Sequence, residues 1–140
     1  ESTNFKTQYS TIPDSFLNLG PYGGILSAFK KDPNSAWLVV ATDLPLLDAN
    51  TLNDLMKGRD KSKMATCFHN PETAFPEPLL TLWEPRAYPI LLQFLAYGYS
   101  CPRKVLINSE IRELPIKNTD ALRNVNTPEE LKVLTKLYKS

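Results

Sequence analysis

Asp43 is the residue of this chain best placed to do chemistry. It follows an apolar run over residues 37–41 and stands two residues before Pro45. An apolar run without polar alternation predicts a strand buried on both faces, as in a parallel sheet, and Pro45 cannot continue it. Open α/β sheets bind ligands at the carboxyl ends of their strands, where a carboxylate can hold Mg²⁺ against phosphate oxygens. Asp43 is therefore a candidate metal ligand and catalytic residue; an Asp that only caps a loop is the alternative.

A glycine-rich segment opens the chain's first predicted helix. Gly20, Gly23 and Gly24 precede an apolar pattern that predicts a helix over residues 25–31. Glycines let a ligand approach the backbone, and a helix N-terminus favours negative charge. The segment is therefore a candidate phosphate-binding turn, although an ordinary flexible loop-to-helix turn is the more common explanation of such a pattern.

Two asparagines form a third candidate feature. Asn124 and Asn126 flank one apolar residue, so both amides point to the same side of an extended segment. The capping box that begins at Thr127 predicts a helix over residues 128–139. The amides suit hydrogen bonding to a polar ligand, although asparagine in a plain turn explains them equally.

The remaining patterns predict an α/β architecture. Asp48 is a predicted helix N-cap and Gly58 the matching stop. The alternation of helices and strands favours a Rossmann-like three-layer α/β/α mixed sheet in a single domain over residues 1–140. The other predicted elements are strands over 36–41, 64–68 and 79–83, a surface loop over 70–78 with His69 beside it, helices over 85–97 and 102–108, and an edge strand over 111–116.

Composition narrows the class of protein. The net charge of +1 without a basic block argues against a nucleic-acid partner. No apolar run reaches the roughly 18–20 residues that span a bilayer, and no signal peptide stands out, so we expect no membrane association and a cytoplasmic location. Cys67 and Cys101 lack CxxC spacing, which predicts two free thiols, buried or half-buried.

Four segments, in this order, carry a family resemblance. Together they resemble the molybdenum cofactor guanylyltransferases, the MobA-like nucleotidyltransferases, from about residue 8 to the end of the chain. The segments are Ile12-Pro13-Asp14 with Gly20-Pro21-Tyr22-Gly23-Gly24, then Thr42-Asp43-Leu44-Pro45, then Glu77-Pro78-Leu79-Leu80, and last Asn124-Val125-Asn126-Thr127-Pro128-Glu129-Glu130-Leu131.

The resemblance implies a reaction and a set of site residues. GMP would pass from GTP to molybdopterin with release of pyrophosphate, by alignment and Mg²⁺ rather than by a covalent intermediate. The implied partners are GTP, molybdopterin and other proteins of molybdenum cofactor synthesis. The implied site residues are Asp43 for Mg²⁺ and the GTP phosphates, Asp14, Gly20, Gly23 and Gly24 for the nucleotide, and Asn124 and Asn126 for molybdopterin.

One family feature has no counterpart in this sequence. Family members carry a Gly-Gly-x-x-x-Arg-Met-Gly-x-Asp-Lys loop that cradles the triphosphate and selects the base. We therefore expect the chain to represent the C-terminal two-thirds of the fold, inactive alone and unable to bind GTP productively. An exposed sheet edge would favour a homo-oligomer. The alternatives are a cytidylyl- or other nucleotidyltransferase and a non-catalytic α/β binding domain.

Overall fold

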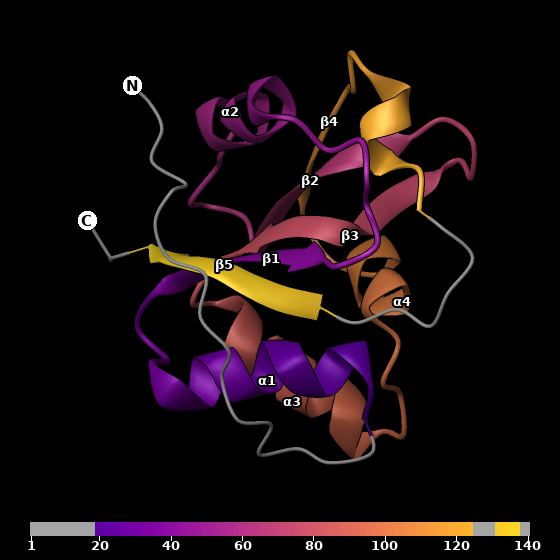
Figure 1. Ribbon diagram of the computed structural model, residues 1–140. Coiled ribbons are helices and arrows are strands. Elements are labelled where there is room, and N and C mark those ends of the chain that lie inside the picture. The colour runs from indigo at the N-terminus through magenta and orange to yellow at the C-terminus, as the bar shows by residue number, and fades with distance from the viewer. Residues whose placement is uncertain (1–18, 125–130, 138–140) are drawn as a thin grey trace.

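The chain forms a mixed five-stranded sheet with helices on both faces (Figure 1). The computed structural model describes residues 19–124 and 131–137. The strands are β1 (Ala36–Ala41), β2 (Ala65–Asn70), β3 (Phe75–Trp83), β4 (Arg112–Leu114) and β5 (Leu131–Leu137). The helices are α1 (Pro21–Lys31), α2 (Ala49–Lys57), α3 (Ala87–Ala96), α4 (Pro102–Ile107) and the 3₁₀ helix η1 (Thr119–Leu122).

The sheet has the order β4-β2-β3-β1-β5. β3 is antiparallel to both β1 and β2, β5 is antiparallel to β1, and β4 is parallel to β2. It follows that β1, β2 and β4 all run in one direction. The end of the sheet at which these three strands terminate is called the carboxyl edge; it lies across the strand ends and is not an outer strand. The α/β class predicted from the sequence is confirmed as a mixed sheet.

The predicted parallel environment of residues 36–41 is wrong, although the strand itself lies at Ala36–Ala41 as predicted. Both neighbours of β1 are antiparallel to it. The apolar run reflects burial on both faces, because α1 packs on one side and α2 on the other. Burial alone does not determine the direction of the neighbouring strands.

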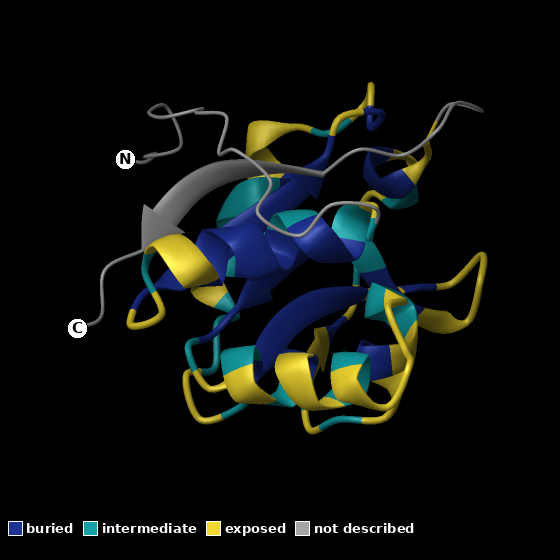
Figure 2. Ribbon diagram, turned by 90° about the horizontal axis from the view of Figure 1, so that it is seen from below, coloured by how far each residue is buried: buried dark blue, intermediate teal, exposed yellow. Residues whose placement is uncertain are grey.

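Two apolar cores lie on the two faces of the sheet. Along β1, Trp37 and Val39 face the core shared with α1, α3 and α4, whereas Leu38 and Val40 face the core shared with α2 and η1. This alternation is the two-residue period of a strand, and it explains why all six residues of β1 are buried. Figure 2 shows buried residues concentrated in the strands and exposed residues on the outer sides of the helices.

A buried hydrogen bond fixes α1 against α3. The Tyr22 hydroxyl donates to the backbone carbonyl of Leu91 at 2.6 Å. Burial raises the pKa of Tyr22 to about 12, so the hydroxyl keeps its proton as a donor. The rings of Phe29 and Tyr88 also stack between the two helices, with centroids 5.3 Å apart. These contacts hold α1 in a defined position beneath the sheet.

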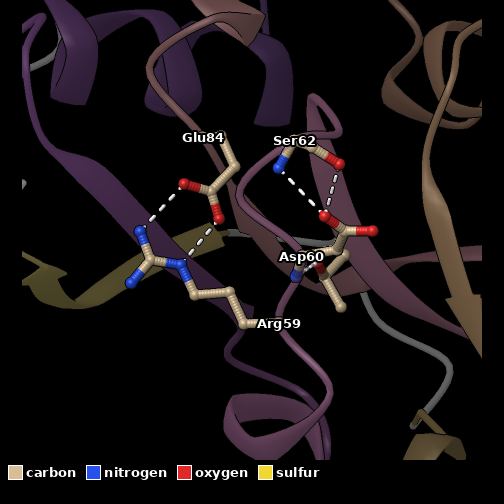
Figure 3. A network of polar contacts seen from close by, with 5 residues as sticks. Arg59, Asp60, Ser62 and Glu84 are labelled. Carbon is tan, nitrogen blue, oxygen red and sulfur yellow. Dashed lines mark hydrogen bonds and ion pairs between the residues drawn. The ribbon is translucent and has the colours of Figure 1, made fainter.

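A polar network closes the edge opposite the carboxyl edge (Figure 3). Arg59, just after α2, forms an ion pair with Glu84, just after β3. Beside it, Asp60 accepts hydrogen bonds from the backbone N–H and hydroxyl of Ser62, while its own N–H donates to the Thr66 hydroxyl. This end of the molecule is therefore fixed by polar side chains that bond to one another.

The helix predicted over residues 128–139 is wrong. Leu131–Leu137 form strand β5, which pairs along β1 from Ala36 to Ala41. The capping box predicted at Thr127 lies outside the described residues. The apolar spacing of this segment fits a helix and a strand equally well, and pairing with the free side of β1 decides between them.

The surface loop predicted over residues 70–78 is also mostly wrong. β2 extends through His69 to Asn70, so His69 is a strand residue, and β3 already begins at Phe75. Only residues 71–74 form a turn. The prolines in this segment fit into β3 because its pairing with β2 is irregular here, with a register shift between Cys67 and His69.

Candidate functional site

Asp43 lies in the turn directly after β1, at the carboxyl edge. Its exposed fraction is 7%, and neither carboxylate oxygen has a hydrogen-bond partner among the described residues. Leu44 beside it is buried in the core under α2, which anchors the turn. A buried carboxylate without a partner is unfavourable, and such groups in proteins generally pair with a cation or a donor.

The N-terminus of α1 lies on the same side of the molecule as the carboxyl end of β1 (Figure 1). Gly20 is the N-cap with a φ of 59°, and its carbonyl accepts the N–H of Gly23 at 3.0 Å. Pro21 is the first helical residue, so the helix begins four residues before the predicted start at residue 25, and Gly23 and Gly24 belong to the first turn of α1. No side chain caps this end and no acidic residue occupies its first turn. Its dipole therefore favours an anion.

Asn124 belongs to the segment that leads to the carboxyl edge. It is exposed, and its neighbour Arg123 bonds to Glu72 in the turn between β2 and β3 at 3.4 Å. Further along, Leu131 pairs with Ala41, two residues before Asp43. The topology thus places the α1 N-terminus, Asp43 and Asn124 at one end of the sheet. The predicted site residues Asp14 and Asn126 lie outside the described residues.

A second buried carboxylate at this edge was not predicted from the sequence. Glu77 is 2% exposed and lies near the start of β3. The Asn70 amide donates to one of its oxygens at 2.8 Å, and the Leu79 N–H donates to the other at 3.0 Å. Glu77 is therefore satisfied within the protein and supports the irregular part of β3, in contrast to Asp43. In the sequence, the feature that could have drawn attention to Glu77 is its position between two prolines.

A hollow of about 520 Å³ runs along the β2 and β4 side of the sheet, from the residues that precede these strands to the β2–β3 turn at the carboxyl edge. Its polar lining includes His69 and Glu113, with the imidazole Nδ1 2.7 Å from a carboxylate oxygen. Its apolar lining includes Phe75 and Ile107. This hollow was not predicted, because the sequence pattern assigned His69 to a loop.

Asp43 is the residue best suited to hold a metal ion. Within the described part of the chain no group of three or more histidine, cysteine, aspartate or glutamate side chains surrounds a common point. Mg²⁺ commonly takes one or two carboxylates and completes its shell with water and phosphate oxygens. A single unpartnered carboxylate therefore fits a magnesium ion that arrives with a phosphate ligand.

The cysteines are not suited to nucleophilic chemistry. Both are free. Burial, together with the nearby Glu113 carboxylate, raises the pKa of Cys67 to about 12, so it stays a thiol. Cys101 is exposed, contrary to the prediction that both are buried or half-buried. No helix in residues 19–124 is long and apolar enough to cross a membrane.

Comparisons with known proteins identify relatives across most of the chain. A molybdenum cofactor biosynthesis bifunctional protein of Synechocystis is 29% identical over 120 residues, which are 86% of this chain and 35% of that protein. A probable molybdenum cofactor guanylyltransferase of Flavobacterium johnsoniae is 25% identical over 125 residues, or 88% and 65% of the two chains. The chain thus spans between about one-third and two-thirds of the length of these relatives.

A solved structure shares the fold. Molybdopterin-guanine dinucleotide biosynthesis protein A from Archaeoglobus fulgidus superposes with a TM-score of 0.63 at 23% identity, over 78% of this chain and 57% of that one. The family model of the MobA-like NTP transferase domain matches residues 2–112, which include the glycine segment and Asp43, while Asn124 and Asn126 lie beyond the match. The resemblance drawn from the four sequence segments is thereby confirmed. The chain belongs to the family of MobA-like NTP transferase domains.

Proposed function

We propose that this chain provides the metal- and phosphate-binding part of a Mg²⁺-dependent nucleotidyltransferase that moves GMP from GTP to molybdopterin. The single observation that carries the proposal is the buried, unpartnered carboxylate of Asp43 at the carboxyl edge. The printed names of the relatives, molybdenum cofactor guanylyltransferases among them, support the choice of substrates.

Asp43 would hold Mg²⁺ at the end of β1. When bound, the ion would offset the negative charge of the triphosphate and of the pyrophosphate that leaves. Asp43 suits this role because its carboxylate is not engaged by any described donor. The surrounding turn is held by Leu44 in the core, so the position of the carboxylate is defined.

The N-terminus of α1 would receive the phosphates. It carries no capping side chain and no acidic residue that would compete with an anion. Gly20 takes a backbone conformation with positive φ that suits glycine, and it presents no side chain at the point of approach. We assign the nucleotide to this side of Asp43, with Gly23, Gly24 and the Asp14 segment, and the acceptor to the side of Asn124 and Asn126.

The reaction itself needs alignment and charge compensation. A phosphate oxygen of molybdopterin would attack the α-phosphorus of GTP, the bond from that phosphorus to the bridging oxygen would break, and pyrophosphate would leave. No side chain is required as a covalent nucleophile, in keeping with the raised pKa of Cys67. The protein's contribution is to align the attacking phosphate oxygen of molybdopterin with the α-phosphorus of GTP, next to Asp43.

We also propose that residues 1–140 are a single domain, the C-terminal portion of the nucleotidyltransferase fold, without activity as an isolated chain. The triphosphate-cradling loop of the family has no counterpart in this sequence. Mg²⁺–GTP is therefore expected to bind this chain more weakly than micromolar. Micromolar affinity in isothermal titration calorimetry would show that the chain suffices for the nucleotide.

The proposal is tested with the leaving group, magnesium pyrophosphate, by titration calorimetry. The wild-type chain should bind it, and Asp43→Asn should weaken binding at least about tenfold through loss of the metal-binding charge. Asp48→Asn is the matched control, because it removes a carboxylate five residues away and keeps a good N-cap. Equal affinity for wild type and Asp43→Asn, or no binding by wild type, would contradict the proposal.

A further inference from the structure

The hollow beside the carboxyl edge has the size and the mixed lining of a small-molecule site. Its volume of about 520 Å³ falls within the range of about 300–1,000 Å³ that is typical of ligand pockets. It runs along β2 and β4, from Lys63 and Glu110 just before these strands to Phe75 at the carboxyl edge, whereas α1 packs beside β1 and β5. Asp43 follows β1, and β3 alone separates β1 from β2 in the strand order.

The polar side of the hollow offers an oriented carboxylate. Glu113 stands opposite Cys67 in the parallel pairing of β4 with β2, and one of its oxygens lies 2.7 Å from His69 Nδ1. The contact fixes the direction of the carboxylate, while the Glu113 side chain remains 34% exposed. Glu110 and Lys63 also line the hollow. A ligand that binds here can therefore donate N–H groups to the carboxylates and accept a hydrogen bond from the Lys63 ammonium.

The apolar side offers surfaces for a flat ring. Phe75 is 44% exposed and Ile107 is 46% exposed, and both line the hollow. Large apolar side chains left open around a cavity gain free energy when a ligand covers them. Leu106 and Ile111 extend the same lining. The combination of an aromatic ring, aliphatic groups and carboxylates suits a flat heterocycle with N–H groups on one edge.

We propose that this hollow binds the pterin ring of the acceptor substrate. A 2-amino-4-oxopteridine presents an amino group and a ring N–H side by side, which match the two oxygens of a carboxylate, and its faces suit Phe75 and Ile107. The inference rests on the proposed function, since the acceptor's phosphate would then extend toward Asp43. The nucleotide is assigned to the opposite side, at the N-terminus of α1.

The test measures binding of free pterin to the full chain by quenching of pterin fluorescence. Glu113→Gln and Phe75→Ala should each weaken binding at least about tenfold, because the first removes the charged acceptor and the second the ring contact. Glu72→Gln, on the same β2–β3 turn, and Leu92→Ala, an exposed apolar residue of α3, are matched controls and should change it less than twofold. Circular dichroism verifies that each variant is folded.

The outcomes separate this inference from the proposed function. If wild type fails to bind pterin, or if Glu113→Gln and Phe75→Ala bind as wild type does, the inference is wrong even when Asp43→Asn abolishes binding of magnesium pyrophosphate. If guanosine binds in place of pterin with the same sensitivity to Glu113, the hollow holds the nucleotide base and the acceptor assignment is wrong. Pterin binding that depends on Glu113 and Phe75 supports the inference, whatever Asp43 does.

Discussion

Arg59 and Glu84 meet at two points: Nε lies 2.7 Å from one carboxylate oxygen and Nη2 lies 2.9 Å from the other. The Glu84 side chain is 2% exposed and that of Arg59 is 16% exposed. The pair joins the segment after α2 to the segment after β3, at the end of the sheet opposite the carboxyl edge that holds Asp43 (Figure 3). One edge of the sheet is thus held by a paired charge, and the other keeps an unpaired one.

Glu84→Gln should destabilise the protein strongly. Removing the Glu84 charge leaves the partly buried Arg59 guanidinium without its counter-charge, and such a loss lowers the free energy of unfolding by about 3–5 kcal/mol in a fully buried pair. Urea unfolding measures the change. The exposed pair between Arg123 and Glu72 is the control, and Glu72→Gln should lower the same quantity by less than about 1 kcal/mol. Equal, small effects in both variants would show that Arg59 and Glu84 contribute little.

The N-cap of α2 predicts how the free energy of unfolding changes with pH. Hydrogen bonds from the side chain and backbone N–H of Thr51 hold the pKa of Asp48 below its usual value. A lowered folded-state pKa adds stability above the unfolded-state value of 3.8, and this contribution is lost as the pH falls through the lower folded-state value. Wild type should therefore lose stability relative to Asp48→Asn between pH 5 and about pH 2.

Urea unfolding of both proteins over that pH range provides the measurement. Asp48→Ala, which removes the cap altogether, should lower the free energy of unfolding by about 1 kcal/mol at pH 7. A constant difference between wild type and Asp48→Asn across the range would contradict the assignment of the cap.

The two thiols should differ sharply in reactivity. Cys101 is exposed, whereas Cys67 is fully buried and its pKa is raised to about 12, chiefly by that burial. Labelling of the native chain with Ellman's reagent at pH 8 should modify Cys101 alone, and Cys101→Ser should abolish the fast reaction. Both thiols should react in denaturant. Rapid labelling of native Cys101→Ser would show that Cys67 is accessible.

Some elements could be predicted because local signals coincide. The strand Ala36–Ala41 joins an apolar run to a following turn and proline, and the second helix lies between a capping Asp48 and a terminal Gly58. β5 could not be predicted, because its place depends on the free side of β1, a partner far away in the sequence. The prolines of β3 misled the sequence pattern for a related reason: an irregular pairing accommodates them.

The candidate site was predictable only in part. Asp43 could be assigned from its position after an apolar strand, and the structure adds that its oxygens lack described partners. The hollow could not be found from sequence, since it brings together His69 and Glu113, which lie 44 residues apart. Such a site depends on the pairing of β2 with β4, which no local pattern encodes.

Thermal unfolding of wild type and Asp43→Asn, each with and without Mg²⁺ and pyrophosphate, tests the central claim most directly. An unpartnered buried carboxylate lowers stability by about 1–3 kcal/mol or more, so Asp43→Asn without metal should melt several degrees higher than wild type. Added magnesium pyrophosphate should raise the melting temperature of wild type and leave that of Asp43→Asn unchanged. If Asp43→Asn melts lower than wild type and responds equally to the ligand, Asp43 serves the fold and the account is wrong.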